Sequence, residues 1–269
     1  MSYLALDIGG TNLRIGLGNG TNKWKKFQEI PLDNNKKTKR IISIIDNFLK
    51  KNHILKSNFK GIGVSIAGLV ENNSVVKISE NLNWKNVPLK KILMNKYKKK
   101  IFIETDVFCG AFFVLNKGEV KKFNSALYIA IGTGIGHSLI INKKIWKGSF
   151  NNANAIGHTI VTNSGTKCYC GLKNCLCMVA SGKVQSSVNP PKGSLKALSQ
   201  VLGNSITLIE PEIIVLTGGA LNLKWFNLNK IKELIKNYTY PEVRLPKIIK
   251  SNIEDINLRG AALLIKHNL

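Results

Sequence analysis

Four side chains that can bind a metal follow one another closely in the sequence. His158 is followed by Cys168, Cys170 and Cys175. One imidazole and three thiolates form the closed tetrahedral ligand set that structural Zn²⁺ takes. Cys177 is a fifth candidate, two residues beyond a complete set. The spacing predicts a structural zinc site, and the alternative is a group of buried cysteines without a metal.

A second group of reactive residues lies in the turn at the start of the chain. Asp7 is followed by Gly9, Gly10, Thr11 and Arg14, directly after an apolar run. Glycines let a backbone approach a phosphate, and a hydroxyl next to them adds a further contact. The carboxylate can hold a hydrated Mg²⁺. The turn is therefore a candidate phosphate site, and the alternative is a glycine-rich hairpin that begins with an acidic residue.

Two later turns repeat this arrangement after apolar strands. Gly132-Thr133-Gly134-Ile135-Gly136 is one, and Leu216-Thr217-Gly218-Gly219-Ala220 is the other. A single Gly-x-Gly is weak evidence, and the first turn lacks the spacing of a dinucleotide-binding fingerprint. Three such turns in one chain favour a nucleotide site, with two turns for phosphates and one for the nucleoside.

These turns need strands and helices to position them. Ile41, Ile44, Ile45, Phe48 and Leu49 have the spacing of an amphipathic helix. Alternation and turn signals predict strands at 3–7, 12–18, 24–30, 61–66, 101–104, 126–131, 138–141 and 213–216, with helices at 106–117, 194–210 and 257–266. Strands that alternate with helices indicate an α/β fold. Since no Pro- or Ser-rich linker is present, we expect two lobes joined near residues 107–120.

The composition limits the classes of partner. The chain has 269 residues, a formal charge of +25 and a pI near 9.9, with lysines scattered along its whole length. Arginine is scarce and no aromatic residues alternate with the basic ones, so we expect weak binding to polyanions and no specific nucleic-acid partner. No apolar run is long enough to cross a bilayer, so we expect no membrane partner. Clustered cysteines and a start without signal-peptide features favour a reducing, cytoplasmic location. Cys109, outside the cluster, is typical of a small core residue.

Taken together, five motifs resemble those of the ROK family of sugar kinases and repressors. They are Asp-x-Gly-Gly-Thr-x-x-Arg at 7–14, Gly-Thr-Gly-x-Gly at 132–136, Gly-His at 157–158, Cys-x-Cys-Gly-x-x-x-Cys at 168–175 and Gly-Gly-Ala at 218–220. Their order and spacing match essentially the whole chain. ROK repressors resemble this arrangement with an added N-terminal winged-helix module. Because the first turn begins at residue 7, we expect no such module.

The resemblance implies an actin-like, hexokinase-type α/β fold with two lobes around a cleft. It places an N-terminal lobe at 1–115, joined by the C-terminal helix at 256–269, and a second lobe with the zinc loop at 116–255. It also implies a homodimer. The activity implied is ATP-dependent phosphorylation of a hexose or N-acetylhexosamine with Mg²⁺, and the zinc is structural.

Residue by residue, the resemblance assigns Asp106 as the general base. It assigns phosphate and nucleotide binding to Asp7, Gly9, Gly10, Thr11, Arg14, Gly132, Thr133, Gly134, Gly218 and Gly219. Substrate binding falls to Gly68, Asn81, Thr105, Asp106 and His158, and the zinc to His158, Cys168, Cys170 and Cys175. A carboxylate at a helix start can accept the proton of a sugar hydroxyl during transfer.

The sugar-binding positions depart from the family pattern. Thr105 stands where Asn is usual, and Ala155 and Cys177 stand where Glu is usual. Phe108 replaces a usual Asn, and His137-Ser138 occupies positions where small residues are usual. Each lost carboxylate removes a charge-assisted hydrogen bond of about 1.5–3 kcal/mol. We therefore expect poor activity on plain glucose.

Two functions remain open from the sequence. One is a working sugar kinase with an altered substrate. The other is a degenerate member that binds nucleotide or sugar in a regulatory or structural role. The retained Asp106 favours the kinase.

Overall fold

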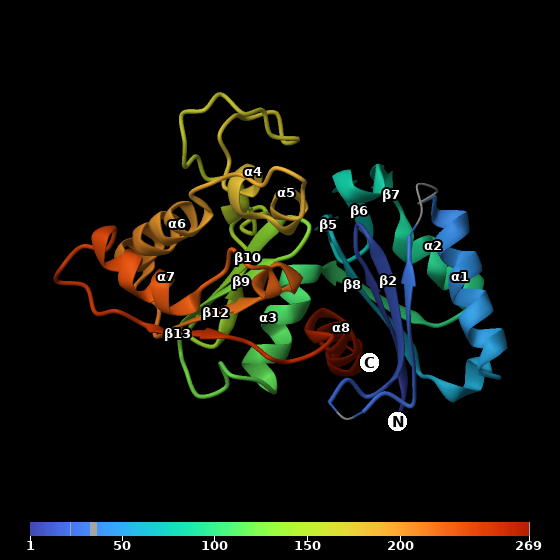
Figure 1. Ribbon diagram of the computed structural model, residues 1–269. Coiled ribbons are helices and arrows are strands. Elements are labelled where there is room, and N and C mark those ends of the chain that lie inside the picture. The colour runs from blue at the N-terminus through green and yellow to red at the C-terminus, as the bar shows by residue number, and fades with distance from the viewer. Residues whose placement is uncertain (22, 33–36, 269) are drawn as a thin grey trace. The chain divides into compact units, whose positions relative to one another are not determined.

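The structure is a computed structural model that describes residues 1–21, 23–32 and 37–268. The chain divides into two compact units (Figure 1). The first comprises Met1–Gly118 with Ile253–Leu269, and the second comprises Glu119–Asn252. Each unit contains its own five-stranded mixed sheet with helices, so the predicted α/β class is confirmed. Each unit is described by itself below.

The sheet of the first unit has the strand order β3-β2-β1-β4-β8. β1, β4 and β8 are parallel, and β1, β2 and β3 are antiparallel neighbours. β1 and β4 are buried throughout because helices cover both faces. The strands are β1 (Tyr3–Ile8), β2 (Asn12–Gly18), β3 (Lys26–Pro31), β4 (Gly61–Ile66) and β8 (Lys100–Thr105); a second, three-stranded sheet contains β5 (Leu69–Glu71), β6 (Val75–Ser79) and β7 (Trp84–Val87).

Different helices cover the two faces of this first sheet. Ala5 of β1 packs with Leu258 and Ala262 of the last helix, α8. The residues next to Ala5 on β1 point to the opposite face of the sheet, where Leu4 belongs to the core that contains Ile41. Short 3-10 turns aside, the helices are α1 (Thr38–Lys51), α2 (Leu89–Tyr97), α3 (Asp106–Asn116) and α8 (Ile256–His267). α3, which begins with Asp106, packs along α8.

α8 approaches the sheet closely because Gly63 leaves room for it. A Cβ at Gly63 would collide with the backbone carbonyl of Ala261. This close approach fixes α8, and with it α3, against the strands whose carboxyl ends carry the candidate catalytic residues.

The second unit repeats the mixed sheet with the strand order β11-β10-β9-β12-β13. β9, β12 and β13 are parallel, while β10 and β11 are antiparallel to their neighbours. Residues of α6 such as Leu198 and Val201 pack with Ile214 in its core. The elements are β9 (Ala126–Ile131), β10 (Ile135–Ile141), β11 (Lys144–Trp146), β12 (Ile213–Thr217), β13 (Lys247–Lys250), α4 (Cys177–Ala180), α5 (Gly182–Gln185), α6 (Ser194–Ile209) and α7 (Leu228–Leu234).

Several predicted boundaries are wrong for reasons visible in the pairing. The strand expected from Trp24 begins at Lys26, because the indole of Trp24 packs over Gly16 instead of continuing the ladder. The strand expected from Ser138 begins at Ile135, which pairs with Ile131. The predicted helices are correct to within about a residue at either end. Among the described helices, none is long and apolar enough to span a bilayer.

Candidate functional site

The carboxyl ends of three parallel strands in the first unit bring acidic and hydroxyl side chains to one edge of the sheet. Asp7 on β1 is in register with Ser65 on β4, which is in register with Glu104 on β8. Asp106 follows directly as the first residue of α3. Residues in register on neighbouring strands point to the same face, so the sheet itself gathers these groups near the start of α3.

Asp7 is a buried carboxylate held by two partners. The Ser65 hydroxyl donates to Asp7 Oδ1 at 2.7 Å, and Arg14 Nη1 lies 3.7 Å from Asp7 Oδ2. Burial raises the pKa of Asp7, and the bond from Ser65 and the charge of Arg14 oppose that rise. Ser65 was not among the predicted site residues, although its place at the end of a predicted strand is a signal for it.

Arg14 contacts two further carboxylates of the first unit. Its Nη2 lies 3.1 Å from Glu29 Oε1, and its Nε lies 3.7 Å from Asp255 Oδ1. Arg14 was predicted to bind phosphate. The structure surrounds its guanidinium with Asp7, Glu29 and Asp255, and phosphate binding by Arg14 stays a prediction. Glu29 and Asp255 were missed, because a single charge on a distant strand or loop gives no sequence signal.

Asp106 is suited to proton transfer near neutral pH. Its side chain is only partly exposed, and its Oδ1 accepts the backbone N–H of Val107 at 2.8 Å. Burial, together with the negative charge of Asp7, raises the pKa of Asp106 to about 7. A base with a pKa near the working pH is ionised in a useful fraction and still takes a proton readily. The predicted general base therefore has the electrostatic character that the role requires.

In the first unit, two predicted substrate residues, Gly68 and Thr105, contact each other, and a third, Asn81, packs against the phosphate turn. The Thr105 hydroxyl donates to Gly68 O at 3.0 Å, and the Thr105 N–H donates to Glu104 Oε1 at 2.9 Å. A Cβ built on Gly10 would lie 2.7 Å from the Cβ of Asn81. Gly10 of the first turn and Asn81 therefore pack against each other, and Thr105 is fixed next to Asp106.

The turn between β1 and β2 is closed by its own backbone. The Gly9 N–H donates to Asn12 O at 3.0 Å, and Thr11 O accepts the N–H of Leu32 at 2.7 Å. The turn is therefore tied to β2 and to the end of β3.

In the second unit, the two remaining glycine turns lie on neighbouring parallel strands. β9 ends before Gly132 and β12 ends before Gly218, and Thr217 is in register with Ala130. Gly218 has φ +107°, and a Cβ there would collide with the carbonyl of Ile131, so only glycine allows β12 to end so close to β9. The predicted nucleotide residues of this unit thus gather at one edge.

Gly132 and Gly219 are the open positions of these turns. A Cβ on either residue would have no heavy atom within 4 Å. The Gly132 N–H donates to Gly134 O at 2.9 Å, and Gly132 O accepts the N–H of Gly182, the first residue of α5, at 2.7 Å. Space next to a fixed backbone is what a bound phosphate or nucleoside requires.

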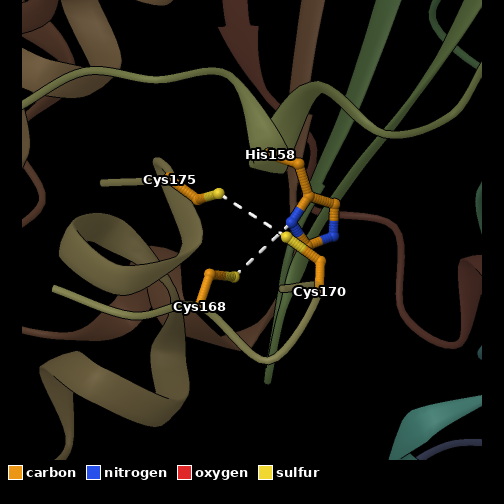
Figure 2. Close-up of side chains that lie close together, drawn as sticks. All are labelled: His158, Cys168, Cys170 and Cys175. Atoms are coloured by element: carbon orange, nitrogen blue, oxygen red, sulfur yellow. Dashed lines mark hydrogen bonds between the residues drawn. The ribbon is translucent and has the colours of Figure 1, made fainter. Parts of the chain in front are cut away.

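The four predicted zinc ligands converge in the second unit (Figure 2). The ligand atoms of His158, Cys168, Cys170 and Cys175 all lie within 4.8 Å of one another. His158 Nδ1 lies 3.6 Å from Cys168 Sγ, and Cys170 Sγ lies 3.7 Å from Cys175 Sγ. Two sulfurs bound at 2.3 Å to one tetrahedral Zn²⁺ are about 3.8 Å apart, and a nitrogen and a sulfur about 3.6 Å. The arrangement fits zinc.

The chemistry of the thiols supports the same fit. Burial and the neighbouring thiols of Cys170 and Cys168 raise the pKa of Cys175 to about 12. Three thiolates this close to one another repel, and a divalent cation removes that penalty. A zinc ion with four protein ligands has no open position for water, which is the pattern of a structural site.

Cys177 lies apart from this cluster. Its side chain is buried against Gly157, and its Sγ lies 3.6 Å from Tyr169 Oη and 3.8 Å from Ile135 O. Ala155 is exposed, at the start of the short turn that carries His158. The two positions that differ from the family pattern therefore carry a buried thiol and an exposed methyl group. Neither group can replace a carboxylate.

Comparison with known proteins places the chain in a family. The family model described as "ROK family" matches residues 3–187. The chain is 26% identical over 259 residues to a xylose repressor of Bacillus spizizenii, covering 85% of this chain and 67% of the repressor. It is 26% identical over 315 residues to a glucokinase of Thermotoga maritima, covering 100% of this chain and 98% of that protein.

A solved structure shows the same fold. It is a ROK family glucokinase from Streptomyces griseus in complex with glucose and AMPPNP, with a TM-score of 0.82 and 21% identity. The match covers 98% of this chain and 99% of that one. The fold is therefore the actin-like, hexokinase-type α/β fold that the motifs implied. With its motifs, its fold and a family model that matches most of its length, the chain belongs to the ROK family.

Proposed function

We propose that this protein is an ATP-dependent sugar kinase. It transfers the γ-phosphate of ATP to a hydroxyl, the 6-hydroxyl, of a hexose or N-acetylhexosamine. The observation that carries this proposal is the state of Asp106, a carboxylate at the start of α3. Its pKa is raised to about 7 by burial and by the negative charge of Asp7. A protein that only binds ligands has no need of a base in this state.

Asp106 accepts the proton of the sugar hydroxyl while the oxygen of that hydroxyl bonds to the γ-phosphorus. The bond between the γ-phosphorus and the bridging oxygen breaks, and ADP leaves. When bound with ATP, Mg²⁺ neutralises charge on the β- and γ-phosphates. Asp7, buried and held by Ser65 and Arg14, is the carboxylate that suits the hydrated cation. Gly132, Gly134 and Gly219 offer backbone to the nucleotide.

The zinc cluster has a supporting role in this proposal. His158 turns its Nδ1 toward the thiols of the cluster, which leaves Nε2 for another partner. His158 and the three cysteines would hold the metal, and the bound imidazole ring would then be fixed, so that Nε2 could bind a sugar hydroxyl without a cost in side-chain entropy.

A second candidate function is a regulator that binds sugar or nucleotide without transfer. Two observations favour it. One is the replacement of carboxylates at Ala155 and Cys177. The other is the likeness to a xylose repressor, 67% of which this chain spans. In this case Asp106 forms a hydrogen bond to a sugar hydroxyl, and the hydroxyl keeps its proton because no phosphoryl transfer follows.

A coupled assay of ADP release decides between these candidates. Purified protein with Mg²⁺ and ATP is tested against a panel of hexoses and N-acetylhexosamines, with the same mixture lacking sugar as the control. The kinase releases ADP only when one of these sugars is present. If no sugar raises ADP release above the control, although calorimetry detects sugar or ATP binding, the protein is the regulator.

A further inference from the structure

His137 on β10 forms two hydrogen bonds to the segment that leads to His158. Its backbone N–H donates to Asn154 O at 3.0 Å, and its Nδ1 accepts the backbone N–H of Ile156 at 3.1 Å. The two bonds hold the backbone on either side of Ala155. His137 therefore supports one of the two places at which a usual carboxylate is missing, the stretch around Ala155.

The bond to Ile156 determines what the rest of the imidazole can do. A neutral histidine has one ring nitrogen that accepts and one that donates. Since Nδ1 accepts, Nε2 carries the proton, and burial lowers the pKa of His137, which favours the neutral ring. Nε2 bonds no protein group among the described residues, and the side chain is partly exposed. Among the described residues, His137 thus has one unused donor and no unused acceptor, on a ring that is bonded to the backbone next to Ala155.

We propose that His137 is a specificity-determining residue, whose Nε2–H donates a hydrogen bond to an oxygen acceptor of the bound sugar. This inference rests on the proposed sugar binding but not on phosphoryl transfer. A carboxylate next to the sugar accepts hydrogen bonds from hydroxyl groups, whereas the exposed methyl group of Ala155 accepts none. This part of the site therefore offers a hydrogen-bond donor, the imidazole Nε2–H, where the family usually has an acceptor.

The exchange of polarity selects the substrate class. A hydroxyl oxygen can also accept from the Nε2–H of His137, but its own proton then finds no acceptor in the methyl group of Ala155. An acetamido carbonyl oxygen is an acceptor only, and it matches the free Nε2–H of His137. The preferred ligand is therefore an N-acetylhexosamine, and a plain hexose with free hydroxyl groups at the same place binds less well.

Two substitutions separate the free donor from the bond to Ile156. In His137→Asn, the amide oxygen can still accept from the Ile156 N–H, but the distant donor is lost. In His137→Gln, the amide nitrogen reaches the place of Nε2, but the nearer acceptor is lost. The matched control is His53→Asn, since His53 is exposed and has φ +53°, a conformation that Asn tolerates.

The expected result is a loss of about tenfold in affinity for N-acetylhexosamine in His137→Asn, which corresponds to one hydrogen bond. His137→Gln should recover part of that loss, and His53→Asn should bind as the wild type does. Calorimetry measures the affinities, and metal analysis checks that the zinc content is the same in all variants. Equal affinity for N-acetylhexosamine in His137→Asn and the wild type overturns the inference.

NMR tests the same inference without any turnover. The chain has four histidines, so ¹⁵N spectra of the imidazole rings can be assigned by substitution. His137 should show the Nε2–H tautomer, and its Nε2 signal should move when N-acetylglucosamine or N-acetylmannosamine is added, while that of His53 stays. A Nδ1–H tautomer, or no binding of either sugar, contradicts the inference. Binding that moves the His137 signal without any ADP release supports the inference and rejects the kinase.

Discussion

Gly10 and Asn81 pack so closely that residue 10 has no room for a side chain. A Cβ on Gly10 would lie 2.7 Å from Asn81 Cβ and 2.9 Å from Asn81 Cγ. The two residues were assigned to different ligands, one to phosphate and the other to sugar. Their contact means that a change at residue 10 acts first on Asn81, whichever ligand is studied.

Gly10→Ala should therefore destabilise the protein by about 1–3 kcal/mol, because the new methyl group must displace Asn81 or the turn. Urea denaturation followed by circular dichroism measures the loss. Asn81→Gly in the same background should recover much of it, since the obstructing atoms are then removed. A Gly10→Ala variant as stable as the wild type contradicts this packing.

Gly132 and Gly219 are better probes of the nucleotide site. An added Cβ meets no heavy atom within 4 Å at either position, so Gly132→Ala and Gly219→Ala should unfold at the same urea concentration as the wild type. We expect each to weaken ATP binding by at least about tenfold, because the methyl group occupies space reserved for the ligand. Calorimetry with Mg²⁺-ATP measures this. Unchanged affinity in both variants would show that these turns do not approach the nucleotide.

The prediction from sequence succeeded for elements with a strong pattern. The spacing from Ile41 to Phe48 predicts a helix that buries these residues, and α1 does so. The small β5-β6-β7 sheet, α7 and the edge strands β11 and β13 were not predicted. They are short, and lysines interrupt their apolar pattern, so their formation depends on packing against distant parts of the chain.

The zinc cluster predicts different outcomes for two neighbouring cysteines. Cys175→Ser should lose the metal and lower the melting temperature, because a serine hydroxyl is a poor replacement for a thiolate ligand. Cys177→Ser should keep about one Zn²⁺ per chain, since its sulfur packs against Gly157 outside the ligand set. Mass spectrometry of metals and a thermal melt measure both. Equal metal contents in the two variants are incompatible with this assignment.

Asp106 links the stability of the protein to pH. Its pKa is raised from 3.8 to about 7 in the folded state. Between these values the folded chain holds a proton that the unfolded chain has released, so the free energy of unfolding falls as pH rises toward about 7. Asp106→Asn has no such titration. The variant should be more stable than the wild type near pH 8, and the difference should shrink toward pH 4.

Urea denaturation of both proteins across this pH range checks the prediction, with Asp46→Asn as a surface control that removes a more exposed carboxylate. A stability difference between Asp106→Asn and the wild type that stays constant with pH would rule out a raised pKa. The gain in the free energy of unfolding would also measure how much stability the wild type loses by keeping a buried carboxylate at residue 106.

The candidate site could be predicted only where a residue belongs to a local motif. His158 and its three cysteines have a recognisable spacing, and the structure brings them together. Arg14 was recognised too, but its contacts with Glu29 and Asp255 join a strand and the start of α8. Such contacts arise from strand register and helix packing, which leave no local pattern in the sequence. The bond from Ile156 to His137 is of the same kind.

The central claim is that Asp106 is the base of a sugar phosphorylation, and the direct measurement is the yield of sugar phosphate by ³¹P NMR. Wild type and Asp106→Asn are incubated with Mg²⁺-ATP and the sugar that performs best in the ADP-release panel. The wild type should form sugar phosphate, and Asp106→Asn should form it about 10²- to 10⁴-fold more slowly while binding ATP equally well. Equal rates of sugar phosphate formation in the two proteins, or none in the wild type, would contradict the claim.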